Sequence, residues 1–367
     1  MKHGLSFALA IAFWGLTAFP AFGAFSSIYV FGDSISCTAS NTTGFACYYG
    51  KRYSNGRVWV EDLAQMQGLA FNPTSNTNSF FGNYSTNVIK QLNSYAPPGD
   101  AATALVILWV NNADLFDPAL NPGTTLSQWS DIINQSQTNH FRIITNLYGK
   151  GFRTIIAPNV VDLSTVPNFN TTSGGYTNTV HQQCIAYNSA YNATLGRLMT
   201  NSSYPSLKIY VPDFFSLLAD LLAHPDHYGA TNALKGGLSI DAVTYFNNLS
   251  LPISTGPGTN FIFWDPTDPS AKVHAIMASV AQQMISPVAI SQIAANAGSN
   301  QLDIVNVPVY TNVPMNGLVL ACTNLAAGSW RTNLTFSTTN PVQSVWVTNT
   351  GPQTFYRLKF PYVWAWP

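Results

Sequence analysis

A serine closes the first apolar run after the N-terminal residues, at a place where its hydroxyl could attack an electrophile. The run ends in Phe31-Gly32-Asp33-Ser34, and the glycine permits a tight turn that presents the Ser34 hydroxyl to solvent. Functional sites of open α/β sheets form at the carboxyl ends of the strands. Gly-Asp-Ser alone also occurs in ordinary turns, so it is the position at the end of the first predicted strand that makes Ser34 the candidate nucleophile.

The elements that must position Ser34 alternate between short apolar runs and stretches of helical period. The apolar runs predict buried parallel strands at 27–31, 105–110, 154–157 and 207–211. The helical periods predict helices at 58–66, 86–93, 126–147 and 176–199, and at 270–285 after Pro269. This alternation predicts an α/β fold with a doubly wound, mostly parallel sheet flanked by helices.

The character of the sequence changes after about residue 298. Short candidate strands, punctuated by Asn, Thr, Gly and Pro, lie at 302–310, 317–321, 334–337, 342–347 and 354–360. They predict a small C-terminal all-β module at residues 299–367, which we expect to serve stability or surface attachment. The α/β domain is then expected to span residues 25–298.

Residues 1–24 have the features of a secretory signal peptide. Lys2 precedes an apolar run at 5–19, and small residues follow that run. A short membrane anchor is the alternative, but the run is shorter than a spanning helix and ends at Pro20. We therefore expect a protein that is secreted, periplasmic or held at the cell surface, with no transmembrane segment in the mature chain.

Composition excludes several classes of protein. Hydrophobic residues make up 46% of the chain and charged residues only 8%, which is too apolar for a disordered protein and too weakly charged for a nucleic-acid-binding protein. The formal net charge is zero, so no long-range field recruits a charged partner.

The cysteines and histidines show no spacing that resembles a zinc site, so no metal is expected. Cys37 and Cys47 flank a polar loop, where a small disulfide is expected in an oxidising compartment. Cys184 and Cys322 lie far apart in the chain and are expected to be buried thiols.

Several segments together resemble one enzyme family. Residues 29–38 resemble block I of the GDSL/SGNH esterases and lipases, and residues 52–59 (RYSNGRVW) are similar to a segment that follows this block in lipase-like members. Phe263-Trp264-Asp265 followed by Pro269 resembles the last block. The likeness spans roughly residues 25–290 in order, and it implies an SGNH-hydrolase-like fold for the α/β domain.

The resemblance implies a serine hydrolase that cleaves carboxylic esters through Ser34. In this family a histidine takes the serine proton, and an aspartate three residues before it, matched by Asp265, orients the ring. The oxyanion is held by the serine N–H, a glycine N–H matched best by Gly82, and an asparagine amide. No cofactor is implied. The expected partner is a small or polymeric ester, either a lipid or an acylated glycan.

Two positions depart from the family pattern. The asparagine block reads Asn111-Asn112-Ala113-Asp114, with alanine at the asparagine position. A neighbouring amide, taken as Asn112 with Asn111 as the alternative, is expected to complete the oxyanion hole. The last block has Asp268 where the histidine belongs, and a carboxylate is the weaker base at neutral pH unless burial raises its pKa.

His274, which follows Asp268 in the predicted helix, is the candidate for a relocated base. The alternative is a histidine that is hydrogen-bonded for structure. The leading hypothesis is thus an active esterase with Ser34, His274 and Asp265, and the second is a degenerate relative that binds a glycan or lipid without turnover. Hydrogen-bonding reach between His274 Nε2 and Ser34 Oγ would favour the first, and a side chain packed in a helix interface would favour the second. A purely structural surface protein is the third hypothesis, and it leaves Ser34 unexplained.

The remaining histidines are expected to have structural roles. His140 and His181 lie in helical stretches and are expected to face solvent or cap a turn. His224 and His227 flank a turn-like region and are expected at the surface. Asp114 and Asp117 follow the strand predicted at 105–110 and could line the rim of the site, but N-capping of a following turn is the more common use of such residues.

Overall fold

The computed structural model describes residues 25–42, 45–170, 174–230, 260–296, 298–307, 314–326, 328–349, 351 and 353–360. The predicted signal peptide at residues 1–24 lies outside these ranges. Among the helices within them, none combines the length and the apolar character that crossing a membrane requires.

The four predicted buried strands form one parallel sheet. They lie side by side in the order β1 (Ile28–Gly32), β2 (Leu105–Trp109), β3 (Thr154–Ile156) and β4 (Lys208–Tyr210). Every residue of β2 is buried, as expected for a strand that is covered on both faces. The predicted parallel α/β sheet is therefore confirmed.

The outer side of β1 has a further parallel contact at its carboxyl end. Gly32 forms an isolated bridge with Ser79, and the Gly32 N–H donates to the carbonyl oxygen of Asn78 at 3.3 Å. The end of β1 thus has a neighbour on each side, residues 78–79 on one and β2 on the other. Doubly wound sheets bind their ligands in the crevice at such a point, where the strand order reverses.

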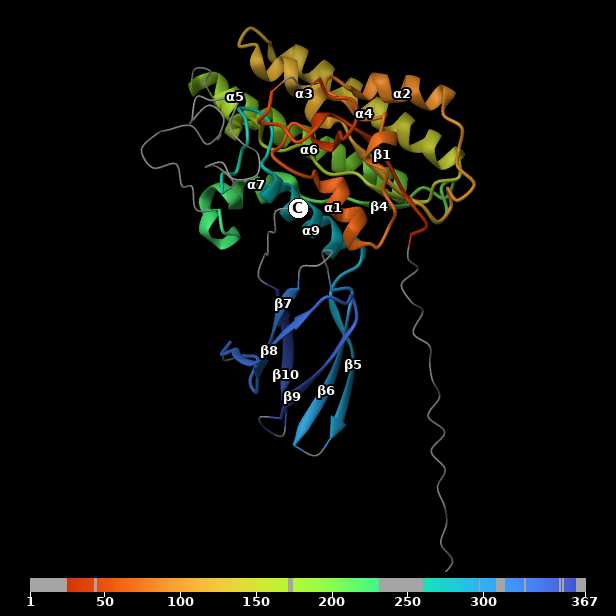
Figure 1. The fold of residues 1–367 in the computed structure, drawn as a ribbon. Helices are drawn as coiled ribbons and strands as arrows, with labels where there is room; N and C mark the ends of the chain where they lie inside the picture. Colours follow the sequence, from red (N-terminus) through yellow and green to blue (C-terminus); the bar gives the residue numbers. More distant parts are fainter. Residues whose placement is uncertain are drawn as a thin grey trace, which may run out of the picture.

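Helices cover both faces of the sheet (Figure 1). On one face α1 (Trp59–Met66) packs against α9 (Ala271–Ile285). The other layer contains α2 (Ser85–Ser94), α4 (Leu126–Gly149) and α6 (Gly174–Met199), in which α4 contacts both neighbours. These five helices match the helices predicted from the helical period.

Three helices were not predicted from the sequence. They are α3 (Asn111–Leu120), α5 (Pro167–Asn170) and α7 (Phe214–Ala223). The first of them starts with two asparagines and contains Pro118, which are residues that disfavour helix interiors in isolation. Tertiary packing overrides that propensity, since α3 contacts both α4 and α5.

The C-terminal region is an all-β module of two antiparallel sheets, drawn in blue in Figure 1. One sheet has the order β5-β6-β9 and the other β10-β7-β8. Their bounds are β5 (Ala289–Asn296), β6 (Ser299–Val305), β7 (Met315–Cys322), β8 (Arg331–Thr338), β9 (Gln343–Thr348) and β10 (Phe355–Lys359). Both sheets contribute to one core, with Leu302 and Val345 from the first packed in the same cluster as Val319 from the second.

The strand β5 was not anticipated, because its sequence AISQIAAN is rich in residues with weak strand propensity and most of its side chains are exposed. It begins at Ala289 and pairs with β6 over its whole length. We therefore propose that the boundary between the α/β domain and the module lies between α9 and β5, ahead of the predicted residue 299.

The predicted disulfide between Cys37 and Cys47 is wrong, because both side chains are free, fully buried thiols. Cys37 Sγ accepts the backbone N–H groups of Ser40 and Asn41, each at 3.2 Å, so the sulfur organises its own loop. Cys47 packs in a separate apolar cluster. Cys184 and Cys322 are buried thiols, as predicted.

Candidate active site

Ser34 begins a single turn of 3₁₀ helix, Ser34–Ser36, immediately after β1. Asp33 caps this turn, since its Oδ1 accepts the N–H of Ile35 at 3.1 Å. Gly32 is required for the close approach of the turn to the strand, because a Cβ there would lie 2.6 Å from the Cβ of Ser36. The strand and the turn therefore hold Ser34 at the carboxyl edge of the sheet, as the sequence predicts.

The Ser34 hydroxyl donates a hydrogen bond to Asp268, with Oγ and Oδ1 3.3 Å apart. Ser34 is 8% exposed and Asp268 is 5% exposed, so the pair is almost completely removed from solvent, contrary to the solvent-facing hydroxyl expected for Ser34. The carboxylate thus occupies the place that the family resemblance assigns to a histidine.

Asp265 holds the loop that carries Asp268. Its Oδ1 accepts the backbone N–H groups of Thr267 at 2.8 Å and Asp268 at 2.7 Å. Its Oδ2 accepts the hydroxyl of Tyr48 at 2.8 Å. The predicted orienting aspartate therefore lies in the site, and it fixes the backbone of its partner. Tyr48 was not singled out from the sequence, because nothing local links it to a residue so far along the chain.

The site gathers carboxyl groups in a buried place. Burial raises the pKa of Asp268 well above its ordinary value, and the Asp265 and Asp33 carboxylates raise it further, whereas the hydrogen bond from Ser34 lowers it. Burial also raises the pKa of Asp33 to about 7, although the N–H of Ile35 opposes this shift. These carboxyl groups therefore take up protons at a much higher pH than exposed ones do.

His274 does not lie at Ser34. Its side chain is fully buried in the interface between α9 and α1, where its Nδ1 accepts the backbone N–H of Trp59 at 3.2 Å. Trp59 is the first residue of α1, and the preceding Val58 has no side chain that could cap the helix. The histidine therefore caps α1 from another helix. This is the arrangement that the structural alternative predicted for His274.

Burial lowers the pKa of His274 to about 3, so its ring is neutral at physiological pH and Nδ1 is free to accept. We expect His274→Ala to lower the free energy of unfolding by roughly 1 to 3 kcal/mol, because it removes the cap and leaves a cavity. Denaturant unfolding measures this difference. The stability difference between parent and variant should shrink as the pH falls from about 6.5 towards 3. In that range His274 binds a proton in the unfolded parent but not in the folded one, which destabilises the parent alone.

His274→Asn is the matched variant, because its amide oxygen can accept the same N–H, and it should recover part of the lost stability. Ester hydrolysis per folded molecule should stay close to that of the parent in both variants. A His274→Ala protein that folds normally and has lost hydrolysis would instead make His274 the base.

A pocket with a cavity volume of about 130 Å³ adjoins Ser34. It brings together the three predicted oxyanion-hole residues, Ser34, Gly82 and Asn112. Gly82 has a φ of +76°, a conformation that favours glycine. The rest of the wall is mostly apolar and includes Ile35, Phe81, Phe116, Val161, Leu163, Val166 and Phe169.

The two adjacent asparagines differ in how their amides are used. Asn111 donates from Nδ2 to the carbonyl oxygen of Pro158 at 2.8 Å, which ties the end of β2 to the loop after β3. Asn112 Oδ1 accepts the N–H of Val161 at 3.1 Å, while its Nδ2 is buried and has no hydrogen-bond partner among the described residues. Of the two amides, that of Asn112 therefore has an uncommitted donor, and Asn112 is the one that lines the pocket.

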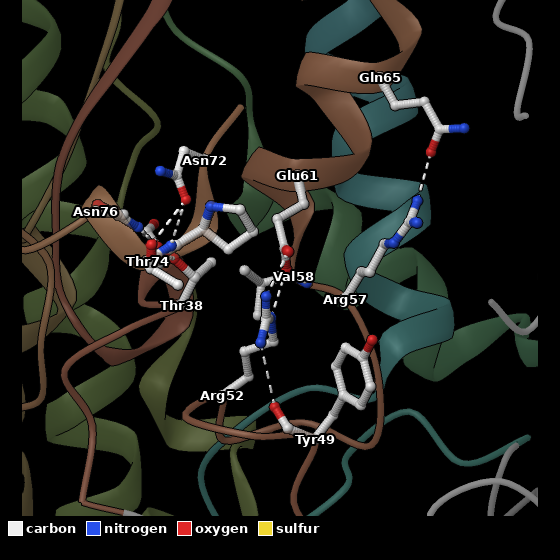
Figure 2. Close-up of polar contacts among 12 residues, drawn as sticks. Thr38, Tyr49, Arg52, Arg57, Val58, Glu61, Gln65, Asn72, Thr74 and Asn76 are labelled. Atoms are coloured by element: carbon white, nitrogen blue, oxygen red, sulfur yellow. Dashed lines mark hydrogen bonds and ion pairs between the residues drawn. The ribbon is translucent and has the colours of Figure 1, made fainter. Parts of the chain in front are cut away.

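The segment 52–59 connects the Ser34 turn to the last helix of the α/β domain. Asn55 Oδ1 accepts the N–H of Ala271 at the start of α9, at 2.8 Å. The Trp59 indole Nε1 donates to Ser36 Oγ at 3.1 Å. Figure 2 shows the other end of the segment, where Arg52 lies against Glu61 and Tyr49. The segment therefore ties the Ser34 turn to both α1 and α9.

Asp114 accepts the N–H of Ser85, the first residue of the earlier helix α2, at 2.8 Å, so it caps that helix and not a turn that follows it. The expectation for His140 is wrong: the ring is fully buried, because it packs between α4 and α6 and its Nδ1 contacts the Ser136 carbonyl oxygen at 2.9 Å. His181 pairs with Asp162 at 2.6 Å.

His224 and His227 are exposed, and their rings stack on one another with centroids 4.9 Å apart. The expected surface position of both residues is confirmed.

Comparison with known proteins places this geometry in a family. Residues 28–281 match the family model of GDSL-like lipases and acylhydrolases. The chain is 29% identical over 172 residues to GDSL esterase/lipase At5g03810 of Arabidopsis thaliana, covering 45% of this chain and 47% of that protein. It is 24% identical over 242 residues to GDSL esterase/lipase APG of the same plant, covering 63% and 67%. The chain thus spans about half the length of the first of these relatives.

Among solved structures, the chain is similar to the lipase Lip_vut3 from a goat rumen metagenome. The TM-score is 0.41 and the identity 11%, over 71% of this chain and 97% of that one. The family model spans the parallel sheet, the Ser34 turn, the asparagine block and the Asp265 loop together. The chain therefore belongs to the family of GDSL-like lipases and acylhydrolases.

Proposed function

We propose that this protein is a secreted serine esterase that hydrolyses carboxylic esters through Ser34. The observation that carries the proposal is the hydrogen bond from the Ser34 hydroxyl to a buried carboxylate, at a pocket that also contains Gly82 and Asn112. Membership of the GDSL-like lipase family supports the same chemistry.

In the proposed reaction, Ser34 Oγ attacks the ester carbonyl and forms a tetrahedral intermediate. The backbone N–H groups of Ser34 and Gly82 and the Nδ2 of Asn112 are the donors for its oxyanion. The acyl-enzyme then reacts with water and releases the acid. None of these steps requires a cofactor.

The apolar wall of the pocket supports an ester with an acyl chain longer than acetyl. A second hollow shares four lining residues with the Ser34 pocket, namely Ile35, Val161, Val166 and Thr267. Its other walls are apolar and come mainly from β2, α7 and α9. An alkyl chain that extends from the first hollow into the second would bury its surface at about 25 cal/mol per Å². A lipid or a glycan with a long acyl group is therefore the proposed substrate class.

A degenerate relative that binds a lipid or glycan without turnover is the second candidate. The observation that favours it is the packing of His274 against α1, which removes the imidazole that the leading hypothesis assigned to Ser34. Both candidates use the same pocket, so binding alone does not separate them.

Hydrolysis of p-nitrophenyl acetate, butyrate and octanoate by the purified protein separates the two candidates. We expect turnover that increases from acetate to octanoate and is lost in Ser34→Ala. The Ser34→Ala variant should still bind a fatty acid, because only the hydroxyl is removed. Binding by the parent with no hydrolysis above the Ser34→Ala background, across acyl length and pH, would establish the second candidate.

We also propose that residues 1–24 are removed on secretion and that the β module attaches the enzyme to a surface or stabilises it. N-terminal sequencing of the exported protein tests the first statement, and a start at Phe25 or near it is expected. Retention of residues 1–24 in the exported protein would contradict it.

A further inference from the structure

The contact between Ser34 and Asp268 raises the question of which group takes the serine proton. Ser34 Oγ has its carboxylate partner at 3.3 Å, and across the described residues no histidine ring lies within hydrogen-bonding distance of this hydroxyl. Both side chains are buried, so bulk water does not separate them. The contact joins a strand end to a loop 234 positions later in the chain, so it is a product of the tertiary fold.

We propose that Asp268 is the general base for Ser34 and that Asp265 is the positioning residue that holds it in place. This inference rests on the proposed esterase function and assigns the base within it. It replaces the imidazole of the family pattern with a single carboxylate.

The proton and the electron pairs balance through one catalytic cycle. As Ser34 Oγ forms its bond to the ester carbon, its proton moves to Asp268 Oδ1, and the carbonyl π electrons move onto the oxyanion. The neutral carboxyl of Asp268 then gives this proton to the leaving alkoxide as the ester C–O bond breaks. In deacylation, Asp268 takes a proton from the attacking water and returns it to Ser34 Oγ, which restores the starting state.

The surroundings of Asp268 make its carboxylate a better base than an exposed one. The groups that face it are the Asp33 and Asp265 carboxylates, the hydroxyls of Tyr48 and Tyr53, and Ser34 itself. Burial and the two acidic neighbours raise the pKa of Asp268. The difference between its pKa and that of a serine hydroxyl is therefore smaller, which makes the proton transfer less unfavourable. Proton transfer to Asp268 also moves one negative charge away from Asp33 and Asp265, towards the oxyanion donors, and so relieves their repulsion.

Asp265 has a different part in this arrangement. Its Oδ1 is engaged by two backbone N–H groups and its Oδ2 by the Tyr48 hydroxyl, all at 2.7 to 2.8 Å. A carboxylate that accepts several such bonds is held in one orientation. Asp265 therefore fixes the loop through the Asp268 N–H. Its negative charge also raises the pKa of Asp268.

The test is the pH dependence of kcat/KM for p-nitrophenyl butyrate in the parent and four variants. In the parent, kcat/KM should rise with pH, and the apparent pKa of this rise should lie well above the value of about 4 for an ordinary aspartate. Asp268→Asn should lower kcat by about 100-fold to 10,000-fold and abolish that rise. Asp33→Asn should move the rise to lower pH, because it removes a repelling charge and keeps the oxygen that caps the Ser34 turn.

The other two variants are a rescue and a control. Asp268→His should recover hydrolysis, with an apparent pKa near the ordinary imidazole value of about 6.5, because it supplies a base in the place that the family pattern gives to histidine. Asp62→Asn is the matched control. Burial raises the pKa of Asp62 to about 7, as it does for Asp33. Asp62 lies on α1, however, and does not line the Ser34 pocket. The apparent pKa of kcat/KM in Asp62→Asn should therefore equal that of the parent.

Failure of the inference can be told apart from failure of the proposed function. Parental kcat in Asp268→Asn, with Ser34→Ala inactive, would overturn Asp268 as the base and leave the esterase intact. An inactive parent with an active Asp268→His variant would show that the carboxylate is not a working base. Absence of Ser34-dependent hydrolysis in every variant would overturn the esterase function itself, and the inference with it.

Discussion

Replacing Arg52 by leucine is expected to lower the free energy of unfolding by about 3 to 5 kcal/mol. Arg52 Nε donates to Glu61 Oε2 at 2.6 Å and its Nη2 donates to Oε1 at 2.5 Å, a bidentate pair in which both side chains are about nine-tenths buried (Figure 2). The substitution leaves the Glu61 carboxylate buried without its cation. That carboxylate also accepts the N–H of Val58 at 3.0 Å, so the loss reaches the start of α1.

Urea unfolding monitored by circular dichroism measures the effect. Arg57→Leu is the matched control, because Arg57 is only half-buried and its side-chain hydrogen bond, to Gln65 at 2.6 Å, is to a neutral group. It should cost less than about 1 kcal/mol. The double variant Arg52→Leu/Glu61→Met should be more stable than Arg52→Leu alone, since it removes the stranded charge. An Arg52→Leu protein as stable as the control would show that the pair contributes no net stability.

Replacing Asn112 by alanine is expected to lower kcat for ester hydrolysis by about 100-fold to 1,000-fold, with a much smaller change in KM. The buried Nδ2 of Asn112 has no partner among the described residues, whereas its Oδ1 is held by the N–H of Val161. A donor that is fixed but unused in the resting protein is suited to a charge that appears only in the transition state.

Steady-state kinetics on p-nitrophenyl butyrate measure this loss. Asn112→Asp separates the donor from the rest of the side chain, because it keeps an oxygen for Val161 and removes the amide hydrogens. Its kcat should be at least as low as that of Asn112→Ala. If both variants kept the parental kcat, the oxyanion would have to be held by the backbone donors alone.

The fold could be predicted from the sequence where burial imposes a pattern on consecutive residues. The run LVILW of β2 is buried on both faces, so it reads as a continuous apolar strand. The helix α4 begins with Thr125 capping the N–H of Gln128 at 3.3 Å, a local signal that leads into a clear helical period. The helix α3 was missed, because Asn and Pro disfavour helices locally and only packing against other helices offsets this.

The site could be predicted where its chemistry is local, and not where it depends on which way a distant side chain points. Ser34 follows from a strand end and a glycine, and Asp265 from its block. The position of His274 in the chain predicts a base for Ser34, yet the face of α9 that carries His274 packs against α1. For Asp268 the opposite holds. A carboxylate is a weaker base than imidazole, so the sequence did not favour it as the base, and only the fold brings its oxygen to Ser34.

The hydrogen bond between Ser34 and Asp268 has a consequence for when the site comes into existence. Its two ends are 234 positions apart, and the ties that bring them together run from residues 48–59 to the Asp265 loop and to α9. Residue 34 is synthesised 234 positions ahead of residue 268. The proposed nucleophile and its proposed base can therefore meet only after the chain has been made through the Asp265 loop and the α/β domain has folded around both ends.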